Sequence, residues 1–179
     1  ANTTGTSNVG VGYAALTANT TASNNTAVGY GALDANTTGS QLTALGVNAL
    51  GANTTAIDNV AVGSHALYVN TTGATNTGVG RSALTANTTG AENTALGAYA
   101  LDANTTANQN TAIGNNALGA NIGSLNTAVG SHALAVNTTA GYNVALGYNA
   151  GGAATTGGSN VCIGASTGDS TVTTGGGNV

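Results

Sequence analysis

Hydrophobic positions recur along the chain at a nearly constant interval of seventeen residues. Most repeats open with Asn-x-Ala-aliphatic-Gly, as in residues 25–29, and continue with Ala-Leu three and four residues after the glycine. A short fixed period is typical of solenoids, in which a repeat buries its apolar residues only by stacking on its neighbours. The pattern therefore predicts one domain, residues 1–179, made of about ten stacked coils. We call the glycine of the opening motif the marker glycine; one interval between neighbours is sixteen, and the set is Gly12, Gly29, Gly46, Gly63, Gly80, Gly97, Gly114, Gly130, Gly147 and Gly164.

Two columns of large aliphatic residues emerge when the repeats are aligned. The residue before the marker glycine is always Val, Leu or Ile, and we call this set the aliphatic column. The fourth residue after the marker glycine is Leu in eight repeats, and we call this set the leucine column; Gly151 and Gly168 take its place in the last two. We interpret both columns as core. Each repeat is then expected to form two short strands joined by turns.

The residue types between these columns select the fold class. Gly, Asn and Thr fill most of the remaining positions, and all three are unfavourable in helix interiors. The sequence thus predicts an all-β protein, a parallel β-solenoid (β-roll) whose coils rise about 4.7 to 4.9 Å each. Identical residues of successive repeats would lie above one another. We expect the Asn that opens each repeat, such as Asn25, to occupy a turn and to form an amide ladder along the axis.

Adjacent apolar residues in a strand suggest that the coil needs a partner. Ala27-Val28 and Ala32-Leu33 are apolar at consecutive positions, and consecutive strand residues face opposite sides. One side would fill the coil and the other would contact another chain. We expect a homotrimer as the simplest assembly, with a monomeric solenoid and an open end-to-end filament as alternatives. Both ends of the sequence fall inside a repeat, from which we expect a segment of a longer array.

Composition removes several classes of function. Arg81 is the single basic residue, against five acidic residues, whereas binding to nucleic acid requires several Lys or Arg side chains. No apolar run approaches the roughly 20 residues that span a bilayer, so we expect no membrane insertion. The lone Cys162 is interpreted as a small buried hydrophobic residue. We expect no nucleic-acid partner and a soluble chain.

Candidate groups for catalysis are too far apart to cooperate. His65 and His132 share a column but stand four coils apart, about 19 Å at the normal strand spacing, and cannot share a metal ion within one chain. Asp34, Asp102 and Asp169 are separated by at least as much and form no acid–base pair. We therefore expect no catalytic, cofactor-binding or metal site, and no enzymatic activity.

A stripe of Asn-Thr-Thr carries two further hypotheses. Its asparagines head acceptor sequons for N-glycosylation, and aligned Thr files could form an ice-binding surface. Two observations weigh against ice binding: adjacent Thr side chains cannot share one strand face, and Ile122-Gly123 interrupts the file. A repeated turn without sugar is the simpler interpretation of the stripe. The candidate glycosylation sites, including one additional sequon at Asn24, are Asn2, Asn19, Asn24, Asn36, Asn53, Asn70, Asn87, Asn104 and Asn137.

Variable positions just after the marker glycines could contact a receptor. Aromatic side chains on an uncharged surface suit glycan or protein ligands, although scattered surface Tyr is also common. The candidate receptor-contact residues are Tyr13, Tyr30, Arg81, Tyr99 and Tyr148.

The motif Asn-Thr-Ala-Val-Gly-x-x-Ala-Leu, at residues 25–33 and 126–134, resembles the head repeats of trimeric autotransporter adhesins. With the Asn-Thr-Thr-Gly linker it resembles even more the repeats of bacteriophage and bacterial tail-fibre proteins. This resemblance covers nearly the whole chain and implies a trimeric parallel β-roll that forms a non-enzymatic fibre or adhesive surface. We expect an extracellular, cell-surface or virion location, with a self-assembling extracellular filament and an ice-binding protein as alternative functions.

Overall fold

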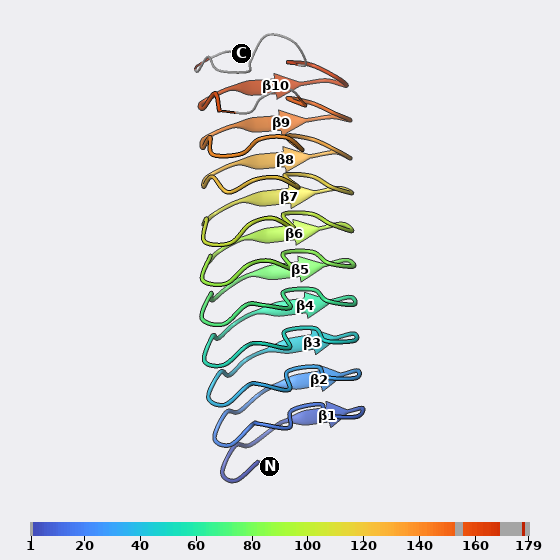
Figure 1. Cartoon of the computed structure of the whole chain (residues 1–179), viewed down its shortest axis with the longest axis vertical. Coiled ribbons are helices and arrows are strands. Elements are labelled where there is room, and N and C mark those ends of the chain that lie inside the picture. The colour runs from blue at the N-terminus through green and yellow to red at the C-terminus, as the bar shows by residue number, and fades with distance from the viewer. Residues whose placement is uncertain (1, 153–155, 169–176, 178–179) are drawn as a thin grey trace.

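Ten short parallel strands form a single sheet in the computed structural model, which describes residues 2–152, 156–168 and 177. Each strand pairs with the strand of the preceding and following coil in sequence order, so the chain winds upward as a straight rod (Figure 1). All-β architecture and the parallel β-solenoid are confirmed. The strands are β1 (Val9–Val11), β2 (Thr26–Val28), β3 (Thr43–Leu45), β4 (Val60–Val62), β5 (Thr77–Val79), β6 (Thr94–Leu96), β7 (Thr111–Ile113), β8 (Thr127–Val129), β9 (Val144–Leu146) and β10 (Val161–Ile163).

The register of the sheet follows the repeat, including its one irregular interval. Thr26 lies opposite Thr43 in the usual coil, whereas Thr111 lies opposite Thr127, sixteen residues later. The missing residue is absorbed in the turn at 121–124, where the Asn121 side chain closes a local loop by donating to the Gly123 carbonyl and accepting from the Gly123 N–H. The strands on either side therefore keep their alignment.

One strand per coil is observed, and the expectation of two was wrong. The Ala-Leu segment after the marker glycine forms turns because the second and fourth residues after that glycine adopt left-handed backbone angles, for example φ 55° at Asn48 and 50° at Leu50. The N–H groups of this segment nevertheless bond between coils. Asn48 donates to Tyr30 O at 2.8 Å in the coil below, and Leu50 donates to Ala66 O at 3.0 Å in the coil above. Both halves of the coil are thus tied along the rod axis.

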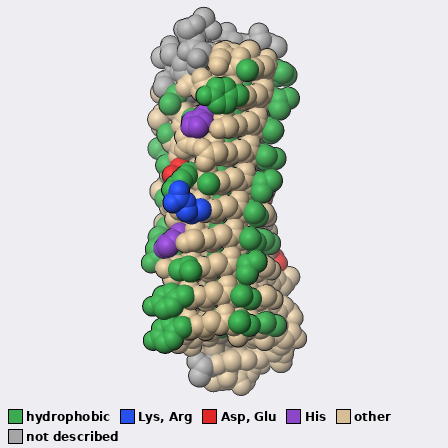
Figure 2. Space-filling model, turned by 90° about the vertical axis from the view of Figure 1, so that its right-hand side faces the viewer, with side chains coloured by type: hydrophobic (Ala, Val, Ile, Leu, Met, Phe, Trp, Pro, Cys, Tyr) green, Lys and Arg blue, Asp and Glu red, His purple; other side chains and the backbone are tan. Residues whose placement is uncertain are grey.

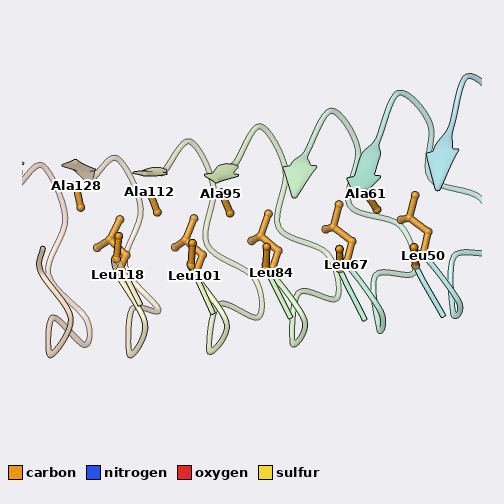
Figure 3. Close-up of a cluster of buried hydrophobic side chains, with 14 of the residues drawn as sticks. Leu50, Ala61, Leu67, Leu84, Ala95, Leu101, Ala112, Leu118 and Ala128 are labelled. Atoms are coloured by element: carbon orange, nitrogen blue, oxygen red, sulfur yellow. The ribbon is translucent and has the colours of Figure 1, made fainter. Parts of the chain in front are cut away.

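The hydrophobic core is a narrow column of alanine and leucine. The central residue of each strand, such as Ala61 or Ala95, points inward toward the leucine column, represented by Leu67 and Leu84, which is fully buried in most coils (Figure 3). Small residues on one wall and leucines on the other fill a coil that contains only seventeen residues. The leucine column is confirmed as core.

The aliphatic column does not lie in the core, contrary to the sequence prediction. Leu45, Leu96 and Leu146 keep 47, 47 and 48% of their side-chain surface exposed, and Ile163 keeps 64%. The cause is strand parity. In β2 to β10 the residue before the strand, which is Asn or Leu42, and the central residue of the strand are both buried. The two residues on either side of the central residue must therefore face outward.

Two asparagine files complete the interior. Asn76 shows the pattern expected for the residue that opens each repeat: its Nδ2 donates to Gly90 O at 2.8 Å, and its Oδ1 accepts the N–H of Asn93 at 2.9 Å. We call this file the ladder asparagines, and its amide ladder is confirmed. A second file, the turn asparagines, comes from Asn-Thr-Thr; Asn53 donates to Asn36 Oδ1 at 2.9 Å and to Ala56 O at 3.2 Å. These bonds satisfy polar groups that the small core could not otherwise accommodate.

Candidate functional site

The outer side of the sheet presents a regular, uncharged surface, which includes the aliphatic column that the sequence had assigned to the core. We call it the sheet face; it comprises the first and third residues of β1 to β10. The third residues are the aliphatic column. The first residues are Val in β1, β4, β9 and β10 and Thr in the other strands, forming a file that contains Thr26, Thr43, Thr77, Thr94, Thr111 and Thr127. Bands of hydrophobic side chains run along the rod in Figure 2.

The Asn-Thr-Thr stripe has a largely structural arrangement. In most stripes the first Thr uses its hydroxyl to tie coils together; Thr37 Oγ1 donates to Thr54 O at 3.0 Å and Thr71 Oγ1 to Thr88 O at 3.1 Å. The second Thr, such as Thr38, is exposed. In coils such as that of Thr37 and Thr38, the first Thr is half-buried and the second is the more exposed of the two.

Seven of the nine candidate glycosylation asparagines lie inside the wall of the coil. Each is at most 1% exposed and uses Nδ2, the atom that would carry the sugar, in hydrogen bonds of the turn-asparagine file. An attached glycan cannot be accommodated there in the folded coil. The buried positions are Asn19, Asn36, Asn53, Asn70, Asn87, Asn104 and Asn137. Asn2 and Asn24, the other two candidates, are exposed.

The candidate receptor-contact residues line the turn edge that follows the strands, but as separate pairs. The rings of Tyr13 and Tyr30 stack with their centroids 5.4 Å apart. Arg81 lies over the ring of Tyr99, with Cζ 4.5 Å from the centroid. Tyr148 meets His132 edge-on at 6.4 Å. Figure 2 shows basic, histidine and hydrophobic side chains spaced along this side of the rod. They do not converge on one pocket.

A recess of about 260 Å³ lies on the turn side of the coils that carry β2 to β4, and sequence reasoning missed it. Asp34, Asn48 and Tyr68 supply its polar and aromatic groups, and Ala35, Gly51 and Ala52 complete the lining. Asp34, Gly51 and Tyr68 occupy the same position in three successive repeats. Gly51 stands between Asp34 and Tyr68 in this column, and the gap left by its missing side chain was the feature of the sequence that could have predicted the recess.

Among the described residues, the ionisable side chains form no cluster suited to hold a metal ion. No group of three or more His, Cys, Asp or Glu side chains comes together within the described ranges, and Asp169 lies outside them. Burial raises the pKa of the Cys162 thiol, which is 6% exposed, and thereby lowers the fraction present as the reactive thiolate. Burial also raises the pKa of the Asp102 carboxyl, partly offset by hydrogen bonds from the N–H groups of Asp102 and Ala103. In the part of the chain that is described, no helix is long and apolar enough to cross a membrane.

Comparisons with known proteins give no relative. No protein-family model matches the chain, and neither a curated protein nor a solved structure matches it.

Proposed function

We propose that this chain is a non-enzymatic segment of a structural fibre, exposed outside a cell or on a virion, which associates with copies of itself through the sheet face. The single observation that supports this proposal most is the exposed aliphatic column. Valine, leucine and isoleucine side chains repeat along the rod without a charged residue among them. Large contiguous apolar surfaces of this kind mark interaction sites in soluble proteins.

The rest of the rod fits a structural role. Backbone and asparagine bonds link every coil to the next, so the rod is rigid along its length without requiring a ligand. Three copies that bring their sheet faces together would bury the aliphatic columns around one axis. The remaining surface would display the turn edge, including Tyr13, Tyr30 and Arg81, to a glycan or protein receptor.

Mass measurement by light scattering tests the proposal. A mass of three chains is expected, and a strictly monomeric rod at high concentration would contradict association through the sheet face. Electron microscopy separates a shaft from the alternative of an end-to-end filament: rods of fixed length support the shaft, and rods of unlimited length support the filament.

Ice binding is a second candidate because of the Thr file on the sheet face. Strand neighbours are about 4.7 to 4.9 Å apart and outward residues within a strand about 6.6 Å apart, so the face is a nearly flat grid of hydroxyl and methyl groups. A grid of fixed spacing can order water into a lattice. Measurement of thermal hysteresis decides: a freezing-point gap supports ice binding, and its absence in a purified monomeric sample excludes it.

A further inference from the structure

The recess beside Tyr68 brings together four kinds of side chain. The carboxylate of Asp34 and the amide of Asn48 line it together with the phenol ring of Tyr68. The imidazole of His65 adjoins both neighbours: Asn48 Nδ2 lies 3.4 Å from His65 Nε2, and the His65 and Tyr68 ring centroids are 5.3 Å apart. The recess thus has a ring on one side and planar polar groups nearby.

Tyr68 is held in place by its surroundings. A Cβ atom added to Gly51 would lie 3.0 Å from Tyr68 Cε2, so the ring rests directly over this glycine. His65 meets the ring at 74°, and its Nδ1 is 2.8 Å from Ser64 Oγ. The side chain is 39% exposed, which leaves part of the ring open to a ligand. A ring fixed before binding loses little conformational entropy when a ligand contacts it.

We propose that this recess is a binding site for one neutral pyranose sugar. The ring of Tyr68 offers an apolar surface for the C–H groups of the sugar, and aromatic rings combine such a surface with a polar end. Asp34 accepts hydrogen bonds from hydroxyl groups, and Asn48 both donates and accepts. The volume of about 260 Å³ accommodates a single hexose.

Charge restricts the class of sugar. Asp34 is the one charged residue of the lining, and no basic side chain lies among the six lining residues. A uronic or sialic acid would therefore bring its carboxylate against that of Asp34 without a compensating cation. Such like-charge contact is unfavourable in a partly enclosed site. Neutral sugars are expected to bind and acidic sugars are not.

The sequence contains a matched control for the site. Four coils further along, five of the six lining residues recur as Asp102, Ala103, Asn116, Gly119 and Ala120, and His132 corresponds to His65. The sixth position, equivalent to Tyr68, is Ala135. The second location therefore has the same polar residues without the ring, and we expect it not to bind sugar.

Saturation-transfer NMR with the full chain and methyl glycosides of glucose, galactose, mannose and N-acetylglucosamine tests the proposal. At least one neutral glycoside is expected to bind at about millimolar affinity, typical of a small shallow site, and glucuronate is not. Tyr68→Ala should weaken binding about tenfold or more, because it removes the aromatic contact. Tyr142→Ala, which removes an exposed tyrosine that lies outside both the recess and the receptor-contact residues, should leave binding unchanged.

The decisive variant moves the tyrosine ring from position 68 to the equivalent position 135. Adding Ala135→Tyr to the Tyr68→Ala chain should restore binding, now at the second location. Circular dichroism establishes that each variant is folded, and Asp34→Ala, a change at an exposed residue, provides a second loss-of-binding variant if the transfer variant does not fold. Absence of binding by the native chain, equal loss with Tyr142→Ala, or retained binding in both Tyr68→Ala and Asp34→Ala would overturn the proposal. Light scattering on the same samples reports self-association separately, because the recess lies away from the sheet face.

Discussion

Asn93 donates two hydrogen bonds to one atom of Asn76 in the preceding coil: its backbone N–H lies 2.9 Å from Asn76 Oδ1, and its Nδ2 lies 3.1 Å from the same oxygen. Both residues are fully buried. Replacing Asn76 by Ala removes this acceptor and leaves the backbone N–H of Asn93 without it, whereas Asn93 Nδ2 still donates to Ala107 O at 2.8 Å. The change also removes the Nδ2 group that donates to Gly90 O. Each buried donor without a partner costs about 1 to 3 kcal/mol.

Asn76→Ala should therefore lower the free energy of unfolding by about 2 to 4 kcal/mol. Urea unfolding followed by circular dichroism measures the change. Asn115→Ala is the matched control, because Asn115 is exposed and donates only to Ala98 O at 3.2 Å. Equal stability of the two variants would show that the amide ladder contributes nothing beyond a surface bond.

A marker glycine should not tolerate a side chain. Gly63 has φ 128°, and a Cβ there would lie 2.6 Å from the carbonyl oxygen of Gly80 in the next coil. Neither atom belongs to a flexible side chain, so the coils would have to separate. We expect Gly63→Ala to cost about 4 kcal/mol or more, as measured by urea unfolding.

Gly10 provides the opposite case at a strand centre. An added Cβ there meets its nearest atom, Leu16 Cδ1, at 3.5 Å, and most other coils have Ala at this position. Gly10→Ala should be neutral or stabilise by up to about 1 kcal/mol through the smaller entropy of the unfolded chain. Destabilisation by both glycine variants to the same extent would contradict the steric explanation.

The sheet face should determine assembly without determining the fold. Replacing Leu45, Leu96 and Leu146 together by Ser removes apolar surface that is about half exposed in the single chain. Each change should weaken association by about 1 kcal/mol, since half a leucine side chain remains to be buried by a partner. Light scattering should report a monomer while circular dichroism stays unchanged. Leu84→Ser, in the buried leucine column, should instead reduce stability; a trimer retained by the triple variant would exclude the sheet face as the interface.

Sugar should be absent from the buried asparagines of folded protein. If the chain is secreted from a glycosylating host, intact-mass and peptide analysis of the folded fraction should find glycans at Asn2 or Asn24 and none at Asn36 or Asn87. The reason is that Nδ2 of the last two is enclosed and hydrogen bonded. A glycan at Asn36 in a chain with the native circular dichroism spectrum would refute this expectation.

Burial of Cys162 should affect both the reactivity of its thiol and the stability of the chain as pH changes. Because the pKa of its thiol is raised in the folded chain, less thiolate is present at pH 8 than in the unfolded chain, and reaction with a thiol reagent should be slower until urea is added. The folded state holds this proton more tightly, so stability should decline as pH rises from the pKa of the unfolded thiol toward that of the folded one. Reaction at the same rate with and without urea would argue against burial.

The repeat predicted the coil, its register and the ladder asparagines because these depend on spacing alone. It did not predict which strand residues face inward. Val28 is more hydrophobic than Ala27, yet Ala27 is buried because it shares the inward face with Asn25 and because the narrow coil already holds Leu33. Recognising that Asn25 faces inward would have fixed the parity of the whole strand.

Positive φ angles and the local packing of one side chain account for the remaining differences between the predicted and the observed structure. Non-glycine residues such as Asn48 and Leu50 adopt positive φ. Hydrogen bonds between coils stabilise these backbone angles, which the residue types alone do not favour. The sequence therefore predicted a strand where the second half of the coil forms turns. The recess depends on the orientation of the Tyr68 ring, which packs over Gly51. Repeat alignment brings the two residues near each other but does not give the orientation of the ring.

The bonds between coils run along the rod, and this direction determines how the molecule would respond to force. A pull applied to the two ends would load the bonds of one terminal coil at a time, because each coil contacts only its neighbours. Each release of seventeen residues would lengthen the tether by about 50 to 55 Å, the extended length of the coil less its rise in the rod. A fibre built from such coils would yield in equal steps, dissipating a sudden load instead of breaking at once.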